Sequence, residues 1–166
     1  MDLDTALTGK PAEGASATEI LRADHAEARR LFAEYRSAAD DAHARGVIAQ
    51  SLCMQLELHD AIERDVFYPA LRQIAAEWTR RANEAHEKIA AAVERVRSGA
   101  DNGGPLDHAI DALENLVEAH VRDEEEHVFP KVEAQRDFSS GELGRALIRR
   151  KEELTRSTSY FEGPAT

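Results

Sequence analysis

The sequence predicts an all-α fold, an up-and-down four-helix bundle with an additional C-terminal helix. Apolar residues recur every three or four positions over four long segments, which is the period of an amphipathic helix. Glycine and proline are few, 9 and 5 of 166 residues, and most of them stand between these segments. Hydrophobic residues make up 42% of the chain and charged residues 32%, a balance typical of a helix-rich globular domain.

The first predicted helix follows a leader. Residues 1–15 contain glycine and proline but no apolar period, so we expect this segment to be flexible. Ser16-Ala17-Thr18-Glu19 has the form of a capping box, which predicts a helix start. From there the apolar stripe indicates a helix that runs to about Ala44 and is broken by Gly46.

The second and third predicted helices follow next in the chain. A stripe from Leu52 to Val66 indicates the second helix, which we expect to end at Phe67-Tyr68-Pro69 because proline disfavours further helix. A third stripe extends from Ala82 to Val96 and leads into residues 98–105, which hold three glycines and a proline and predict a loop.

The fourth predicted helix carries a stripe from Leu113 to Glu124 and is expected to stop near Phe129-Pro130. Ser139-Ser140-Gly141-Glu142 again has the form of a capping box, so Ser139 to about Ser157 is expected to form a fifth helix outside the bundle. The predicted organisation is therefore a leader (1–15), a bundle (16–135), and a C-terminal helix with a tail (136–166).

The two predicted helix pairs contain the same polar pattern. Each has a histidine, then 33 residues, then His-x-x-x-Glu with a proline six residues after the glutamate. Every residue of the pattern recurs 61 positions further along the chain. The residues are His25, His59, Glu63 and Pro69 in the first half and His86, His120, Glu124 and Pro130 in the second. The histidines and glutamates fall on the apolar stripes, so we expect them to face the bundle interior.

This spacing is typical of a metal site. Residues four apart on a helix lie roughly 40° apart around the axis and about 6 Å along it, so His and Glu at this spacing reach one point. Glu63 and Glu124 each have two oxygens and can bridge two ions. A single histidine on an apolar stripe is more often an ordinary core residue, but two buried glutamates need a partner. Imidazole with carboxylate suits iron, manganese or zinc.

At these residues the sequence resembles the hemerythrin-like family, also called the HHE cation-binding domain, over about residues 18–133. The resemblance implies a bundle with two iron ions, bridged by oxo, hydroxo or water oxygen beside Glu63 and Glu124. Oxygen-carrying members usually have a second histidine four residues after the third-helix ligand, where this sequence has Ala90. This departure favours an open, reactive or labile site over stable oxygen carriage.

The predicted function is therefore a di-iron protein that binds or reacts with a small oxidant, namely oxygen, peroxide or nitric oxide. Whether it turns over this molecule as an oxidoreductase is left open. One alternative is an iron donor or storage protein for the repair of iron centres. Another is a metal or redox sensor that acts on a partner through the C-terminal helix.

Composition excludes several other classes. The net charge of −11 argues against a nucleic-acid partner, which needs a basic face. No segment approaches the roughly 20 apolar residues of a membrane span. The N-terminus lacks the features of a secretion signal, so we expect a cytoplasmic protein, either a monomer or a weak homodimer. The single cysteine, Cys53, excludes an internal disulfide and is expected to be a packing residue.

Several other residues were candidates for a place in or near the site. We expect His43 and His108, near helix ends and unmatched in the repeat, to be exposed. His127 remains open between a further ligand, a proton donor and a polar residue at the bundle end. Tyr35 and Tyr68 each have a phenol, and helical phase does not decide whether it lies near the metal site.

Gln55 lies one turn before His59 on the ligand side and is expected to be a packing residue. The alternatives are a hydrogen bond to an imidazole or a place in the lining of a small cavity. In the acidic run Asp123-Glu124-Glu125-Glu126 only Glu124 has the phase of the inner stripe, so the other three predict a solvated face.

Overall fold

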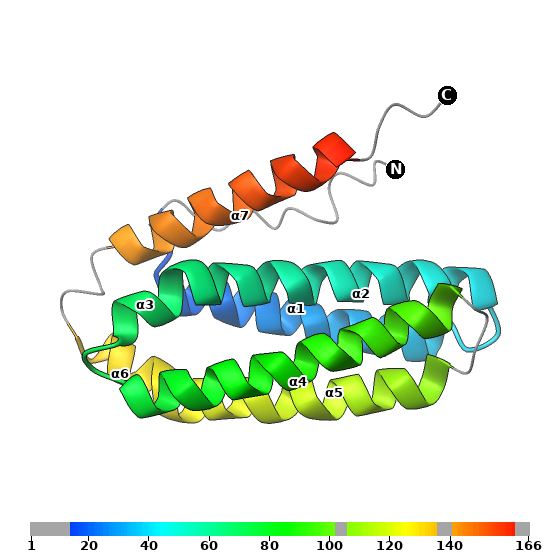
Figure 1. The fold of residues 1–166 in the computed structure, drawn as a ribbon, viewed down its shortest axis with the longest axis horizontal. Helices are drawn as coiled ribbons and strands as arrows, with labels where there is room; N and C mark the ends of the chain where they lie inside the picture. The colour runs from blue at the N-terminus through cyan, green and yellow to red at the C-terminus, as the bar shows by residue number, and fades with distance from the viewer. Residues whose placement is uncertain (1–13, 102–105, 136–140, 162–166) are drawn as a thin grey trace.

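The structure is a computed structural model that describes residues 14–101, 106–135 and 141–161. Figure 1 shows four long arms that run up and down side by side, with α7 lying across one side. The arms begin with α1 (Ala17–Ser37), α2 (Ala42–Ile62), α4 (Ala76–Asp101) and α5 (Leu106–Asp123). The described residues contain no strand, so the predicted helical bundle with a fifth helix is confirmed. No described helix is long and apolar enough to cross a membrane.

The second and fourth arms each contain a π-helical turn and a short final helix. The second arm continues through η2 (Glu63–Phe67) into α3 (Tyr68–Leu71). The fourth arm continues through η3 (Glu124–Val128) into α6 (Phe129–Glu133). The two π turns occupy equivalent positions in the sequence repeat, and each begins at the repeated glutamate.

The prediction that these helices end at proline is wrong, because the π turn carries the helix past it. Proline has no N–H, and in an α-helix its ring clashes with the carbonyl four residues earlier. In η2 the Tyr68 N–H donates to the carbonyl of Glu63, five residues before it, and Phe129 does the same to Glu124 in η3. Each proline thus lies in the first turn of a new helix, where a missing N–H costs little.

The first two helices meet earlier than predicted. The capping box of Ser16 and Glu19 is present at the start of α1, but this helix ends at Ser37 rather than near Ala44. Asp41 starts α2 by accepting a hydrogen bond from the Ala44 N–H at 2.8 Å. Gly46 therefore lies inside α2, where a Cβ added to it would have no atom within 4 Å.

The later boundaries also shift. Helix α4 continues to Asp101, four residues into the predicted 98–105 loop, and the rest of that loop lies outside the described residues. Helix α7 spans Glu142–Phe161, so it ends four residues later than predicted. The proposed caps Ser139 and Ser140, and all but the last two residues of the 1–15 leader, also lie outside the described part.

Two apolar clusters fill the interior. One extends between α1, α2, α4 and α5 and includes Phe32, Leu52 and Val96. The other joins the π turns and short helices to α7 and includes Phe67 and Leu147. The repeated histidines and glutamates lie between the two clusters along the bundle. Their polar atoms are therefore sealed from solvent on both sides.

Candidate metal centre

The structure brings the six repeated residues together in the bundle interior. His25 comes from α1, His59 from α2, His86 from α4 and His120 from α5, and the two glutamates begin η2 and η3. Their exposed fractions lie between 0% for Glu63 and 6% for His59, so no donor of the set is open to bulk solvent.

The donor atoms form two groups that share Glu63. Ligand atoms within 4.8 Å of one another define a four-residue group and a three-residue group. The first consists of His25, His59, Glu63 and Glu124, and the second of Glu63, His86 and His120. Two adjacent groups with one common carboxylate are the arrangement expected for a pair of ions.

Both carboxylates reach histidines of both groups. Glu63 Oε2 lies 3.3 Å from His59 Nε2 and 2.8 Å from His86 Nε2. Glu124 Oε2 lies 3.4 Å from His25 Nε2 and 3.5 Å from His120 Nε2. Each glutamate thus stands between one histidine of each group, as a bridging ligand must.

Several donor atoms of the set have no hydrogen-bond partner, whereas His86 Nε2 and one oxygen of each glutamate are bonded to Tyr68. Most of the buried side-chain nitrogen and oxygen atoms without a hydrogen bond among the described residues belong to these six residues. They include Nε2 of His25, His59 and His120 and one oxygen each of Glu63 and Glu124. An unpaired buried polar atom is unfavourable unless something binds it. These convergent nitrogen and oxygen atoms therefore fit a metal of the iron, manganese or zinc type.

A second layer of carboxylates holds three of the four imidazoles. His25 Nδ1 is hydrogen-bonded to Glu125 Oε1 at 2.9 Å. His86 Nδ1 lies 2.6 Å from Asp60 Oδ1, and His59 Nδ1 lies 3.6 Å from Asp24 Oδ2. A carboxylate at Nδ1 fixes the ring so that Nε2 points at the centre and makes it a better donor. Among the described residues His120 has no such partner, since only its Nε2 contacts carboxylates.

Each outer carboxylate is next in the chain to one of the six residues but serves a different helix. Asp24 precedes His25, Asp60 follows His59, and Glu125 follows Glu124. Neighbouring residues are about 100° apart around a helix axis, so the adjacent side chain points at the next helix. Helical phase alone assigned the acidic run 123–126 to solvent, and for Glu125, which is half-buried, this prediction is wrong.

The charges of the centre balance within it. Burial would raise the pKa of Glu63, but nearby His59, then His120 and His86, outweigh this and hold the pKa well below its usual value. Burial alone would lower the pKa of the His86 imidazole, but contacts with Asp60 and Glu63 raise that pKa to about 9. Without metal, positively charged imidazole therefore neutralises the carboxylates. A bound cation would replace those protons.

Tyr68 is the phenol that joins the centre. Its hydroxyl lies 2.9 Å from Glu63 Oε2 and 2.8 Å from both Glu124 Oε1 and His86 Nε2. Burial and the two negative carboxylates raise the pKa of Tyr68 well above its usual value. The phenol therefore keeps its proton and donates it to a carboxylate. Tyr35, in contrast, is bonded to Asp107 and Arg45, which are not part of the centre.

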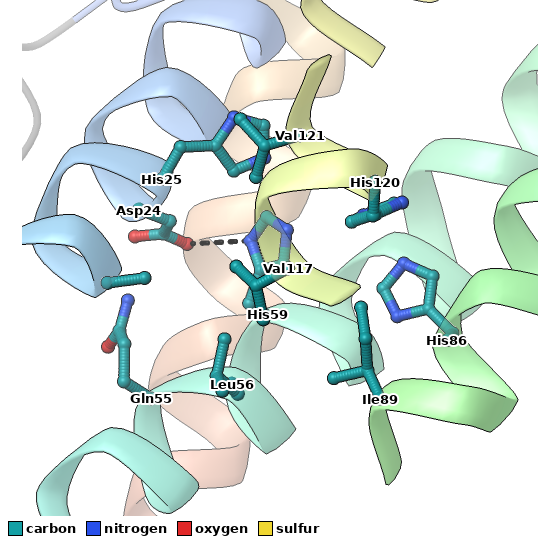
Figure 2. A pocket seen from close by; sticks show the side chains of 11 residues that line it. Asp24, His25, Gln55, Leu56, His59, His86, Ile89, Val117, His120 and Val121 are labelled. Atoms are coloured by element: carbon teal, nitrogen blue, oxygen red, sulfur yellow. Dashed lines mark ion pairs between the residues drawn. The ribbon is translucent and has the colours of Figure 1, made fainter. Parts of the chain in front are cut away.

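A small cavity borders all four histidines. It measures about 10 Å³ and has room for roughly one water-sized molecule. Figure 2 shows the imidazoles together with apolar residues such as Leu56, Ile89 and Val117 and with Gln55, for which lining a cavity was the less favoured alternative. A second cavity of about 20 Å³ lies beside His120 and Glu124.

Comparison with known proteins identifies the family. The model of the hemerythrin HHE cation-binding domain matches residues 16–132 and, in a second overlapping match, residues 79–156. The chain belongs to the hemerythrin HHE cation-binding domain family. The structure is similar to the crystal structure of a hemerythrin HHE cation-binding domain-containing protein from Mycobacterium kansasii, with a TM-score of 0.75 and 23% identity over 88% of this chain and 91% of that one. No curated protein sequence matches the chain.

Within this hemerythrin-like bundle, the role assigned to Ala90 needs correction. Ala90 is exposed on α4, because the next inward-facing residue after His86 is Ile89. The small residue one turn from His86 that faces inward is Ala82, four residues before it. Ala82 lines the cavity beside His120 and Glu124, so that position leaves space in the three-residue group.

The remaining candidates lie outside the hemerythrin-like centre. His43 and His108 are exposed, as predicted. His127 is also exposed, and its ring stacks on Trp78 at 4.4 Å between centroids, which excludes it from the donor set in this structure. Cys53 is buried, and burial raises the pKa of its thiol to about 11, consistent with a packing residue.

Proposed function

We propose that the chain binds two iron ions between its four histidines and two glutamates and uses them to bind or react with a small oxidant. Two donor groups that share Glu63 and contain several buried atoms without a hydrogen-bond partner among the described residues carry this proposal. Iron held there would supply a redox-active ion with a coordination position open to oxygen, peroxide or nitric oxide. Manganese and zinc suit the same donors, so the metal has to be measured.

The surrounding residues fit a small and weakly polar reactant. The cavity beside the histidines has room for about one water-sized molecule, so a reactant that reaches it has to be small. Apolar side chains such as Leu56, Ile89 and Val117 line it beside the four imidazoles, Gln55 and Asp24. The imidazoles are buried, so the proposed reaction would take place away from bulk water.

Tyr68 supplies a proton at the same place. Its hydroxyl contacts Glu63 and Glu124 and lies beside His86, in the three-residue group. A protonated phenol positioned by two carboxylates can donate a proton to a reactant and recover it from protonated His86, whose pKa is raised to about 9. We therefore assign Tyr68 the role of proton donor.

The decisive experiment measures metal and reactivity together. Protein purified without added metal is analysed for metal content, and its ultraviolet-visible spectrum is examined for the absorption of oxo-bridged di-iron(III). We expect two irons per chain and a spectral change on adding peroxide or nitric oxide that chelator-stripped protein lacks. Equal reactivity of the loaded and stripped proteins would rule out the proposed oxidant chemistry, and another metal would rule out iron.

The cytoplasmic location and the monomeric or weakly dimeric state stay predictions. The iron-donor alternative makes a different prediction, which is transfer of the bound iron to an apo iron–sulfur protein. A loaded protein that gives up its iron in this way, without reacting with oxidants, would favour that alternative.

A further inference from the structure

Helix α7 lies against the part of the bundle that carries the metal centre. It contacts α1, α2 and the π turn η2, and Figure 1 shows it lying along these elements. Leu147 of α7 is fully buried in the cluster that contains Phe67 and Tyr68. Arg150 donates to Asp65 of η2 at 2.9 Å. The docked helix therefore contacts the same turn that begins with Glu63.

One side chain of α7 reaches the second layer of the centre. Lys151 Nζ forms an ion pair with Asp24 Oδ1. The other oxygen of this carboxylate, Oδ2, faces His59 Nδ1 at 3.6 Å, the contact drawn as a dashed line in Figure 2. Neither Oδ2 nor Nδ1 has a hydrogen-bond partner among the described residues, so each is available to the other. Lys151, Asp24 and His59 thus form one chain of contacts from α7 to the donor set.

The carboxylate beside His59 differs from the two other outer carboxylates in where its cation comes from. Asp60, beside His86, is held by Arg64 of η2 at 2.6 Å. Glu125, beside His25, lies 3.6 Å from Arg29 of α1. Both of those cations belong to the bundle arms, whereas Lys151 belongs to α7. Only the carboxylate beside His59 therefore depends on the docking of a helix outside the bundle.

The burial of Asp24 makes the cation matter. The side chains of Asp24 and His59 are 8% and 7% exposed, whereas that of Lys151 is 27% exposed. A buried carboxylate that loses its cation is more stable when it turns toward water, and this rotation withdraws it from the imidazole. His59 then loses the acceptor that fixes its ring orientation.

We infer that Lys151 is a positioning residue for the metal centre, which holds Asp24 against His59 and so couples the docking of α7 to the retention of metal. The inference rests on the proposed metal binding but not on the identity of the oxidant. Coupling between two sites is reciprocal, so the bound ion in turn favours the docked position of α7.

The test is a double-mutant cycle on iron release. Full-length protein loaded anaerobically with Fe²⁺ is mixed with excess 2,2′-bipyridine, and release is followed by absorbance in the wild type, Lys151→Met, Asp24→Asn and the double variant. Loss of a second-layer partner typically weakens metal binding by about 10- to 100-fold. We expect Asp24→Asn to accelerate release of one iron within this range, and Lys151→Met to accelerate it by about 10-fold. Because both act through one carboxylate, the double variant should release iron no faster than Asp24→Asn.

Two controls distinguish loss of the Lys151–Asp24 ion pair from a general loosening of α7. Arg149→Met removes an exposed cation two residues away on the same helix and should leave both release phases within about twofold of the wild type. Lys151→Arg keeps the charge and should restore near-wild-type release. Lys151→Gln is a second neutral variant with the same expectation as Lys151→Met, should the latter fold poorly.

The outcomes are distinct. Release from Lys151→Met at the rate of Arg149→Met, or effects that multiply in the double variant, would overturn the inference. A wild type that takes up fewer than two irons would instead count against the proposed function, whatever the variants do.

Discussion

Replacing Glu63 by glutamine tests the two-ion assignment most directly. The substitution keeps the shape of the side chain but removes the charge of the one residue that belongs to both donor groups. Glu63 is fully buried, and its Oε2 lies within 3.6 Å of three imidazole nitrogens. Glu124 also contacts one histidine of each group, but it belongs to the four-residue group alone. Both ions should therefore lose a ligand at once.

The size of the effect follows from the number of donors. A four-ligand structural zinc site binds with about 10–16 kcal/mol near neutral pH, so one ligand contributes on the order of 3 kcal/mol. A loss of this size weakens binding about 100-fold. The three-residue group keeps only His86 and His120 and should lose its ion outright. Glu63→Gln should thus retain at most one ion per chain, bound at least about 100-fold more weakly than in the wild type.

Metal analysis after gel filtration in a weak chelator measures the retained ions. Glu126→Gln is the matched control, because it removes an equivalent charge from an exposed residue of the neighbouring acidic run. The control should keep two ions, and circular dichroism should show that both variants fold. Two tightly bound ions in Glu63→Gln would refute the bridging role and the division into two groups.

Three further predictions follow from the same contacts. Tyr68→Phe should keep both ions but slow the reaction with peroxide by about 10²- to 10⁴-fold, measured by stopped-flow absorbance, because it removes the proton donor; an unchanged rate would remove Tyr68 from the chemistry. In chelator-stripped protein the raised pKa of His86, about 9 compared with an ordinary value of 6.5, stabilises the fold below pH 6.5, and this stability is lost as the pH rises through 9. Denaturant unfolding should therefore show a decrease on the order of 3 kcal/mol between these pH values, and equal stability at both would contradict the charge balance described for the centre. Gly144→Ala should destabilise the protein by about 1–3 kcal/mol, since a Cβ there would overlap the backbone oxygen of Ala15 and displace α7. Gly46→Ala in α2, where no atom lies near the added Cβ, should instead stabilise the protein by about 0.5–1 kcal/mol. Melting temperatures that shift in the same direction for both variants would contradict this packing of α7.

The sequence was sufficient to find the six residues that meet in the bundle. The repeat at 61 residues and the phase of each amphipathic stripe are local properties, and helical geometry converts them into a position along each arm. His25 and His86 have no glutamate four residues after them, but the repeat placed them in the set. Their burial at 2% each agrees with the inward phase that the stripes predicted.

The π turns could not be predicted from these patterns because a proline is compatible with two local structures. It can end a helix, or it can follow a turn in which the hydrogen-bond ladder shifts by one residue. The second outcome is stabilised here by tertiary packing, since Phe67 and Phe129 are fully buried directly before Tyr68 and Pro130. The choice depends on contacts between arms, which a pattern within one arm does not contain.

The outer carboxylates escaped prediction for a related reason. Asp24, Asp60 and Glu125 lie off the inner stripes, and their partners are on other helices. A usable signal was present, because each of them is adjacent in sequence to one of the six residues. Adjacency becomes informative only once the order of helices around the bundle is known. Lys151 is harder still, since it acts through a helix whose docking site no pattern specified.

The spacing of inward residues on α4 explains why the position of the missing fifth histidine was misjudged. The inward stripe on this helix alternates between steps of four and three at Ala82, His86, Ile89, Val93 and Val96, and Ala92 is buried beside it. A second histidine four residues from His86 faces the centre only on the N-terminal side, at Ala82. That position adjoins the cavity beside His120, the one histidine without an outer carboxylate. The space left by Ala82 and the least supported imidazole thus occur together, so we expect the three-residue group to be where a small oxidant enters.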